Sequence, residues 1–204
     1  MPDFSFETAA PATPVCGVDE AGRGPWAGPV VAGAAILNPA TAPVRLDDSK
    51  RLNAARRDAL FLELQDHAVG VGIASVEEID RFNILNATYL AMQRAIAALP
   101  IAPGHLLIDG NRIPLGLTAS AEAVVKGDSR SMSIAAASIV EKVTRDRIMQ
   151  RLAKDYPGYG WERNAGYGVK AHEKALRRLG VTPHHRRSFK PIHKILCEDI
   201  STSH

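Results

Sequence analysis

Short apolar runs bounded by glycine or charged residues alternate along this chain with longer segments of helical spacing. The short runs predict strands over residues 15–19, 28–37, 68–76, 105–109 and 122–126. The first two strands are expected to form a hairpin across residues 20–27, where glycines and prolines gather. These strands are short and mostly apolar, which is typical of a buried sheet.

Apolar residues at helical spacing predict helices between and after these strands. They cover residues 53–65, 84–99, 131–155 and 170–179. Asn53 is a favourable N-cap, Pro100 ends the second helix and Gly180 ends the last. Strands come early and helices dominate late, which indicates an α/β layered domain with a mixed sheet and helices packed on it.

Length and composition fit one ordinary domain. The 204 residues are 46% hydrophobic and 23% charged, which excludes a disordered or coiled-coil chain. We expect a loose arm over residues 1–14, a domain over 15–191 and a tail over 192–204. Neither a membrane span nor a secretory signal is expected. Cys16 and Cys197 are far apart and form no CxxC motif, so we expect a reducing cytoplasmic location.

The charges are distributed unevenly although their sum is small. The net charge is only +3, yet residues 141–194 hold 14 Lys/Arg and 5 Asp/Glu. This asymmetry indicates a polyanionic partner for the last third of the chain. A solvated basic surface is the alternative that composition alone leaves open.

Four acidic residues each end an apolar run beside a glycine. They are Asp19 and Glu20 in GVDEAGRGP, Asp109 in LLIDGN and Asp128 in VVKGDS. We expect Asp19 at a strand end and Glu20 in the following turn. Carboxylates brought together repel unless a cation intervenes, and oxygen-only ligands favour Mg²⁺ or Mn²⁺. Two such ions about 3.5–4 Å apart activate a water and stabilise the leaving oxygen of a phosphodiester. Considered singly, Asp109 is typical of a turn residue and Asp128 of a helix cap. Only the occurrence of all four acids in this pattern favours a metal site.

Two further segments are candidates for nucleic-acid contact. The glycine-rich loop 21–29 contains Arg23, whose guanidinium suits phosphate, although many such loops are plain hairpin turns. Residues 156–172 interleave aromatic, glycine and basic residues, which suits stacking with phosphate contacts alongside. The basic segment 184–190 is expected to extend this nucleic-acid-binding surface. The alternative is a solvated segment without a partner. The histidines lack accompanying cysteines or an HExxH motif, so zinc is not expected.

In combination these motifs resemble the bacterial ribonuclease HII family of the ribonuclease H-like superfamily. The resemblance extends from about residue 15 to about residue 191. It is carried by GVDEAGRGPWAGPVV, LDDSKRL, NILNATYLAM, LIDGN, KGDSRSMSIAAASIVEKVTRDRIM, GYG and HHRRSF, in the order of the family. The resemblance implies a ribonuclease H-like fold, with a mixed central sheet flanked by helices and a helical C-terminal extension.

The resemblance also implies a metal-dependent endoribonuclease, which we expect to act as a monomer. Its substrates would be RNA–DNA hybrids and single ribonucleotides embedded in duplex DNA, cut on the 5′ side of the ribonucleotide to leave 3′-hydroxyl and 5′-phosphate ends. Ribonucleotide excision repair and primer removal both fit such an activity. The residues that match the family's metal-binding acids are Asp19, Glu20, Asp109 and Asp128. The residues that match its substrate-binding positions are Gly22, Arg23, Gly24, Ser49, Lys50 and Tyr167, with Tyr167 packing on the neighbouring deoxyribose.

The chain departs from the family pattern in two places. Ala165 and Val169 flank the GYG motif where the family often has lysine and threonine, and Glu141 stands where alanine is usual. We expect Glu141 on a helix surface, with little effect. The alternative hypotheses for this protein are a non-catalytic nucleic-acid-binding module and a member of the sister family ribonuclease HIII. The second usually carries an extra N-terminal domain, for which the residues before Val15 leave no room.

Overall fold

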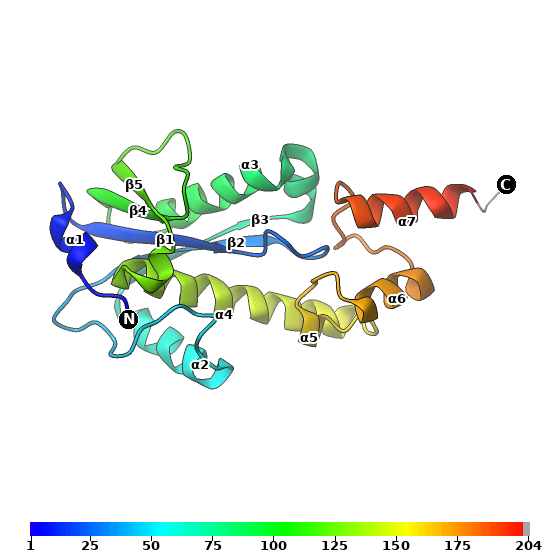
Figure 1. Cartoon of the computed structure of the whole chain (residues 1–204), viewed down its shortest axis with the longest axis horizontal. Coiled ribbons are helices and arrows are strands. Elements are labelled where there is room, and N and C mark those ends of the chain that lie inside the picture. The colour runs from blue at the N-terminus through cyan, green and yellow to red at the C-terminus, as the bar shows by residue number, and fades with distance from the viewer. Residues whose placement is uncertain (202–204) are drawn as a thin grey trace. The chain divides into compact units, whose positions relative to one another are not determined.

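A five-stranded mixed sheet organises the first part of the chain, as the computed structural model shows (Figure 1). The structure describes residues 1–201, with side chains described through residue 198. The strands are β1 Val15–Ala21, β2 Val30–Ile36, β3 Ala68–Ala74, β4 His105–Asp109 and β5 Ser120–Val124, in the order β3-β2-β1-β4-β5. β1 runs antiparallel to β2, whereas β4 runs parallel to both β1 and β5. The predicted mixed sheet and its first hairpin are therefore confirmed.

Helices follow and separate the strands. The helices are α1 Ser5–Ala9, α2 Ala54–Glu63, α3 Val76–Ala97, α4 Met132–Asp155, α5 Trp161–Asn164, α6 Lys170–Leu179 and α7 Lys190–Ser201, with 3₁₀ turns at Leu64–Asp66 and Gly127–Ser129. The main chain of Arg56 donates a hydrogen bond of 2.9 Å to Asn53, which confirms the predicted N-cap of α2. α6 ends at Gly180, as predicted. No helix in the described part of the chain is long and apolar enough to cross a membrane.

The chain divides into two compact units drawn from interleaved segments. Unit 1 comprises Met1–Ala21, Val31–Ile73 and Thr88–Thr144. Unit 2 comprises Gly22–Val30, Ala74–Ala87 and the chain from Arg145 onward. Because each unit is assembled from three separate segments, no linker in the sequence marks a boundary.

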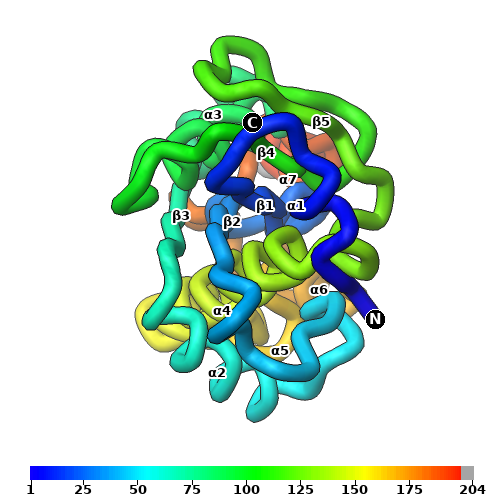
Figure 2. The backbone as a smooth tube through the Cα atoms, turned by 90° about the vertical axis from the view of Figure 1, so that its left-hand side faces the viewer, coloured from blue at the N-terminus to red at the C-terminus, as the bar shows by residue number. Residues whose placement is uncertain are grey.

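Close packing of helices on the sheet explains the small residues of unit 1. A Cβ atom at Gly17 on β1 would overlap the backbone of Ser133 on α4, and one at Gly33 on β2 would overlap the carbonyl of Ala137. Together with the alanines of α4, these glycines let the helix lie directly on the strands. α3 covers the other face of the sheet (Figures 1 and 2). The first part of α4 therefore packs directly on β1 and β2.

Several boundaries differ from those expected. α3 begins at Val76 and is interrupted at Asn83 (φ 67°, ψ 164°), so the predicted helix 84–99 corresponds only to its second part. β5 covers 120–124 rather than 122–126. Helices α5 and α7 were not predicted, and α7 occupies most of the expected tail 192–204, of which 202–204 lie outside the described residues.

The N-terminal segment 1–14, expected as a loose arm, contains α1. Glu7 in α1 accepts hydrogen bonds from the Ser131 hydroxyl (2.7 Å) and the Ser133 main chain (2.8 Å). A carboxylate at these positions satisfies donors at the start of α4 and interacts favourably with the helix dipole. The segment is thereby joined to the long helix by charge-assisted hydrogen bonds.

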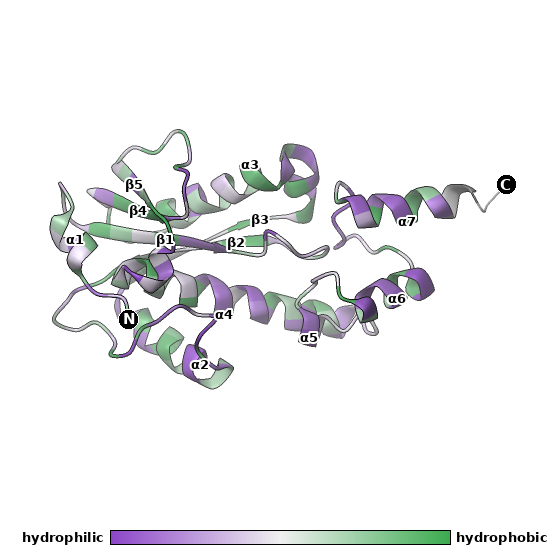
Figure 3. Ribbon diagram, viewed as in Figure 1, coloured by the Kyte–Doolittle hydropathy of each residue, from purple (hydrophilic) through white to green (hydrophobic). Residues whose placement is uncertain are grey.

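Unit 2 has its own core, built mainly from α4 after residue 144, α5, α6 and α7. Its buried residues are Ala27, Met149, Tyr159, Trp161, Ala175, Leu176, Ile192 and Ile195. Hydrophobic and hydrophilic stretches alternate along α6 and α7 (Figure 3), as expected for helices with one buried face.

Candidate active site

Three carboxylates of unit 1 meet at one edge of the sheet. Side-chain oxygens of Asp19, Asp109 and Asp128 lie within 4.8 Å of one another. Asp19 and Asp109 follow the paired residues Val18 and Ile108 of the parallel strands β1 and β4, so the strands bring them to the same edge. β5 ends at Val124, and the 3₁₀ turn that follows carries Asp128.

A glycine in that 3₁₀ turn permits the closest contact in this cluster. The Gly127 main chain donates a hydrogen bond of 2.6 Å to Oδ1 of Asp109. A Cβ atom at residue 127 would overlap the Ile134 side chain and lie 3.2 Å from that same oxygen. The turn therefore needs glycine to bring a backbone donor onto the carboxylate.

The cluster is electrostatically unfavourable on its own. Asp19 and Asp128 are buried, with 4% and 7% exposure, and Asp109 is half-buried. Burial and the charge of Asp109 raise the pKa of Asp19 well above its ordinary value. Burial and the charge of Asp128 likewise raise the pKa of Asp109. A hard divalent cation would remove this penalty, and a set of carboxylate oxygens without cysteine or histidine fits Mg²⁺ or Mn²⁺.

Glu20 does not lie in the turn that its sequence context predicted. β1 continues through Ala21, so Glu20 occupies a strand position opposite Ala32 rather than a turn. Successive residues of a regular strand alternate between its two faces, and the Glu20 main chain donates a hydrogen bond of 2.7 Å to Oδ1 of Asp19. Its charge still raises the pKa of Asp19, although Glu20 is outside the group of three converging acids.

Lys50 and Ser49, both expected to contact phosphate, occupy different environments in unit 1. Lys50 is exposed, and its Nζ lies 3.5 Å from Oδ2 of Asp128. Burial opposes its charge, but the nearby carboxylates of Asp19 and Asp128 raise the pKa of Lys50 overall. Ser49 is only 2% exposed, and its main chain bonds to Ser138 and to Arg57. Lys50 is thus placed to reach a ligand of the acidic cluster, whereas Ser49 holds the loop in position.

The glycine-rich loop belongs to unit 2, where two buried arginines bind its carbonyl groups. Arg186 donates to the carbonyls of Gly22 (2.5 Å), Arg23 (3.0 Å), Gly28 (2.9 Å) and Pro29 (3.2 Å). Arg145 donates to the carbonyls of Ala27 (3.2 Å), Pro29 (3.1 Å) and Ala165 (3.0 Å). Neither arginine stands out in the sequence, because the burial of both depends on tertiary contacts. Together they fix the conformation of the loop.

Tyr167 lies beside this loop within the same unit. A Cβ atom at Gly24 would be 3.4 Å from Cε1 of Tyr167. Tyr167 is 49% exposed to solvent. The ring is therefore available to a ligand at the position of Gly24. This arrangement brings together two of the predicted substrate-binding residues.

Two buried histidines secure the main chain of Tyr167. His172 bonds through Nδ1 to the Tyr167 carbonyl (3.0 Å), and its Nε2 lies 3.1 Å from Nε2 of His185. Trp161 donates to His172 Nε2, and the Thr182 main chain donates to His185 Nδ1 (both 3.0 Å). Burial, followed by the charge of His172, lowers the pKa of His185 to about 3. All four ring nitrogens therefore serve internal contacts of neutral histidines.

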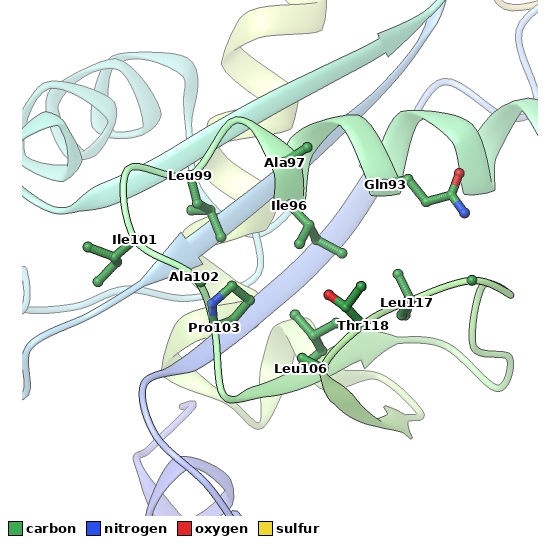
Figure 4. Close-up of a pocket in the computed structure, with 12 residues that line it drawn as sticks. Gln93, Ile96, Ala97, Leu99, Ile101, Ala102, Pro103, Leu106, Leu117 and Thr118 are labelled. Atoms are coloured by element: carbon green, nitrogen blue, oxygen red, sulfur yellow. The ribbon is translucent and has the colours of Figure 1, made fainter.

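A separate pocket in unit 1 lacks such chemistry. It has a volume of about 380 Å³ and lies between the end of α3, Leu106 and the loop at 116–119 (Figure 4). No titratable side chain lines it. The acidic edge of the sheet, rather than this pocket, therefore carries the candidate catalytic groups.

A mixed sheet packed with helices, with three carboxylates converging at one edge, fits a metal-dependent nuclease of the ribonuclease H type. A model of the family "Ribonuclease HII" matches residues 16–192. The chain therefore belongs to the ribonuclease HII family and is a ribonuclease H that acts on nucleic acid.

Bacterial relatives agree with this assignment over nearly their whole lengths. The chain is 60% identical over 203 residues to ribonuclease HII of Ruegeria pomeroyi, covering 98% of this chain and 87% of the relative. It is 58% identical over 206 residues to ribonuclease HII of Cereibacter sphaeroides, covering 99% and 97%.

Solved structures support the fold. Ribonuclease H2 from Pyrococcus horikoshii is 29% identical with a TM-score of 0.76, covering 90% of this chain and 97% of that one. Bst-RNase HIII in complex with Mn²⁺ is 18% identical with a TM-score of 0.71, covering 90% and 69%, and shows the shared fold alone.

Proposed function

We propose that this chain cleaves the RNA strand of RNA–DNA hybrids and single ribonucleotides embedded in duplex DNA. The cut falls on the 5′ side of the ribonucleotide and leaves 3′-hydroxyl and 5′-phosphate ends. The convergence of Asp19, Asp109 and Asp128 within 4.8 Å carries this proposal, since it supplies a carboxylate site for the divalent ions that phosphodiester hydrolysis uses.

The acidic side chains have the role of holding Mg²⁺ or Mn²⁺. When bound, two such ions would activate water and stabilise the leaving oxygen. Asp19 and Asp109 occupy neighbouring positions on β1 and β4, and the Gly127 main chain orients Asp109 through its hydrogen bond. Glu20 belongs to the proposed set as well: its side chain lies outside the group of three, and its charge, which raises the pKa of Asp19, adds to the negative potential that would attract the ions. No covalent intermediate with the protein is required.

The loop at Gly22, Arg23 and Gly24 has the proposed role of recognising the ribose 2′-hydroxyl through backbone groups. The two buried arginines support it, because a loop whose carbonyls are held internally keeps one fixed conformation. Tyr167 beside Gly24 would pack on the adjacent deoxyribose, and Lys50 would contact phosphate. The enzyme is proposed to act as a monomer.

The central experiment is cleavage of a duplex that contains one ribonucleotide, with mapping of the cut position and of both ends. Cleavage is expected with Mg²⁺ or Mn²⁺ and not in EDTA, and Asp109→Asn is expected to abolish it. Full turnover by Asp109→Asn with Mg²⁺ would contradict the role of Asp109. Undiminished duplex binding without any cleavage in either metal would instead favour a non-catalytic binding module.

Replacement of Tyr167 tests recognition of the junction. Tyr167→Ala is expected to reduce cleavage at a single embedded ribonucleotide more than cleavage in a long hybrid, because stacking is most needed where deoxyribose follows. Tyr167→Phe keeps the ring and is the matched control. Equal losses on both substrates would count against the proposed role.

A further inference from the structure

Glu141, expected on a helix surface, is buried beside the acidic cluster. Its main-chain nitrogen on α4 lies 3.1 Å from the position that a Cβ atom at Gly33 would take. Gly33 pairs directly with Asp19 across β2 and β1, and residues opposite one another in antiparallel strands project to the same face. The Asp19 side chain therefore projects toward the face of the sheet that α4 covers near Glu141. The expectation of a surface position is wrong because α4 turns this residue inward.

The carboxyl group of Glu141 has an unsatisfied oxygen. The residue is 3% exposed, and its Oε2 has no hydrogen-bond partner among the described residues. Burial, followed by the negative charge of Asp19, raises the pKa of Glu141 well above its ordinary value. Glu20 acts in the same direction, whereas Lys142 and Lys50 oppose it.

A buried carboxyl oxygen without a donor is unfavourable, and its surroundings show what would satisfy it. If Glu141 had only a structural role, a protein group would be expected to hydrogen-bond its buried Oε2. The described part of the chain supplies no such partner. The neighbouring acids form a site suited to a hard divalent cation, which interacts favourably with further carboxylate oxygens. A cation bound in this site would compensate the Glu141 carboxylate.

We infer that Glu141 is an additional acidic residue of the divalent-ion site, acting from α4 beside Asp19 to strengthen cation binding. The inference deepens the proposed function and rests on it, because it assumes that the acidic edge of the sheet binds the ions. With the cation bound, the ionised Glu141 carboxylate attracts it and raises the affinity of the site. Glu141 differs in this from the acids whose replacement is expected to abolish cleavage.

Direct titration of Mn²⁺ into the full-length protein tests this role without relying on activity. Free Mn²⁺ is measured by electron paramagnetic resonance for the wild type, Glu141→Gln and Glu141→Ala. Glu122→Gln is the matched control, since Glu122 is an exposed acid on β5 of the same unit. Loss of a residue that supports a metal site lowers affinity about 10–100-fold, and we expect both Glu141 variants to fall near the lower end of that range.

The outcomes separate this inference from the proposed function. Weaker Mn²⁺ binding by both Glu141 variants, with Glu122→Gln unchanged, supports the inference. Wild-type affinity in Glu141→Gln overturns it, even if the wild type cleaves the ribonucleotide-containing duplex. A wild type that neither binds Mn²⁺ nor cleaves overturns the proposed function as well. Urea unfolding in EDTA checks that the variants are folded, and a variant that unfolds more readily yet binds Mn²⁺ normally also refutes the role.

Discussion

Asp109→Asn should make the metal-free protein more stable while it removes activity. The substitution keeps the shape of the side chain and an oxygen that can accept the Gly127 hydrogen bond, but it removes one of three converging negative charges. The folded protein holds these charges together, whereas the unfolded chain separates them. Neutralising Asp109 therefore favours the folded state.

The magnitude follows from the separation of the carboxylates. The carboxylate oxygens lie within 4.8 Å of one another, and two unit charges at that limiting separation repel by about 3.5 kcal/mol at an effective dielectric constant of about 20. Three effects reduce this figure: Asp109 is partly exposed to solvent, the positive charge of Lys50 offsets part of the repulsion, and the Gly127 hydrogen bond weakens by about 0.5–1 kcal/mol when its acceptor becomes neutral. We expect a net gain of about 1–2 kcal/mol in the free energy of unfolding.

Urea unfolding in EDTA at pH 7 measures this gain. The difference between Asp109→Asn and the wild type should shrink as the pH is lowered, because the raised pKa values of Asp19 and Asp109 mean that protonation relieves the repulsion in the wild type. Added Mg²⁺ should stabilise the wild type more than the variant. Asp66→Asn, at an exposed acid, is the control. Equal or lower stability of Asp109→Asn in EDTA would refute the electrostatic reasoning.

Three further predictions address packing, capping and ionisation. Gly72→Ala should lower the free energy of unfolding by about 1–3 kcal/mol, because its Cβ would overlap the Ala91 carbonyl on α3; an unchanged urea midpoint would contradict this. Asn53→Ala should cost about 1 kcal/mol through loss of the Arg56 hydrogen bond, whereas Asn53→Asp should retain it, as urea unfolding can show. The His185 ring should stay neutral well below pH 6.5, since its folded pKa is lowered to about 3, and its contribution to stability should be lost only as the pH falls from about 6.5 toward that value. Nuclear magnetic resonance titration of the imidazole checks this, and a midpoint near 6.5 would exclude a buried neutral ring.

The periodicity of the chain predicted much of the fold because its strands and main helices are locally encoded. The runs at β1, β2, β3 and β4 and the spacing of α2, α4 and α6 were identified from neighbouring residues alone. α1, α5 and α7 were not predicted, and neither was the first part of α3, which begins at Val76, two residues after the end of β3. α5 has only four residues, too few for a helical period to appear.

The sequence by itself singled out Asp19, Glu20, Asp109 and Asp128, because each ends an apolar run beside a glycine, and three of these four converge in the structure. Only the tertiary structure decided how the neighbouring groups are used. The extension of β1 places Glu20 on a strand, and packing of α4 against Gly33 turns Glu141 inward. The reason is physical: local pattern reports the conformation of a segment, whereas burial and electrostatic coupling arise from segments that lie far apart in the chain.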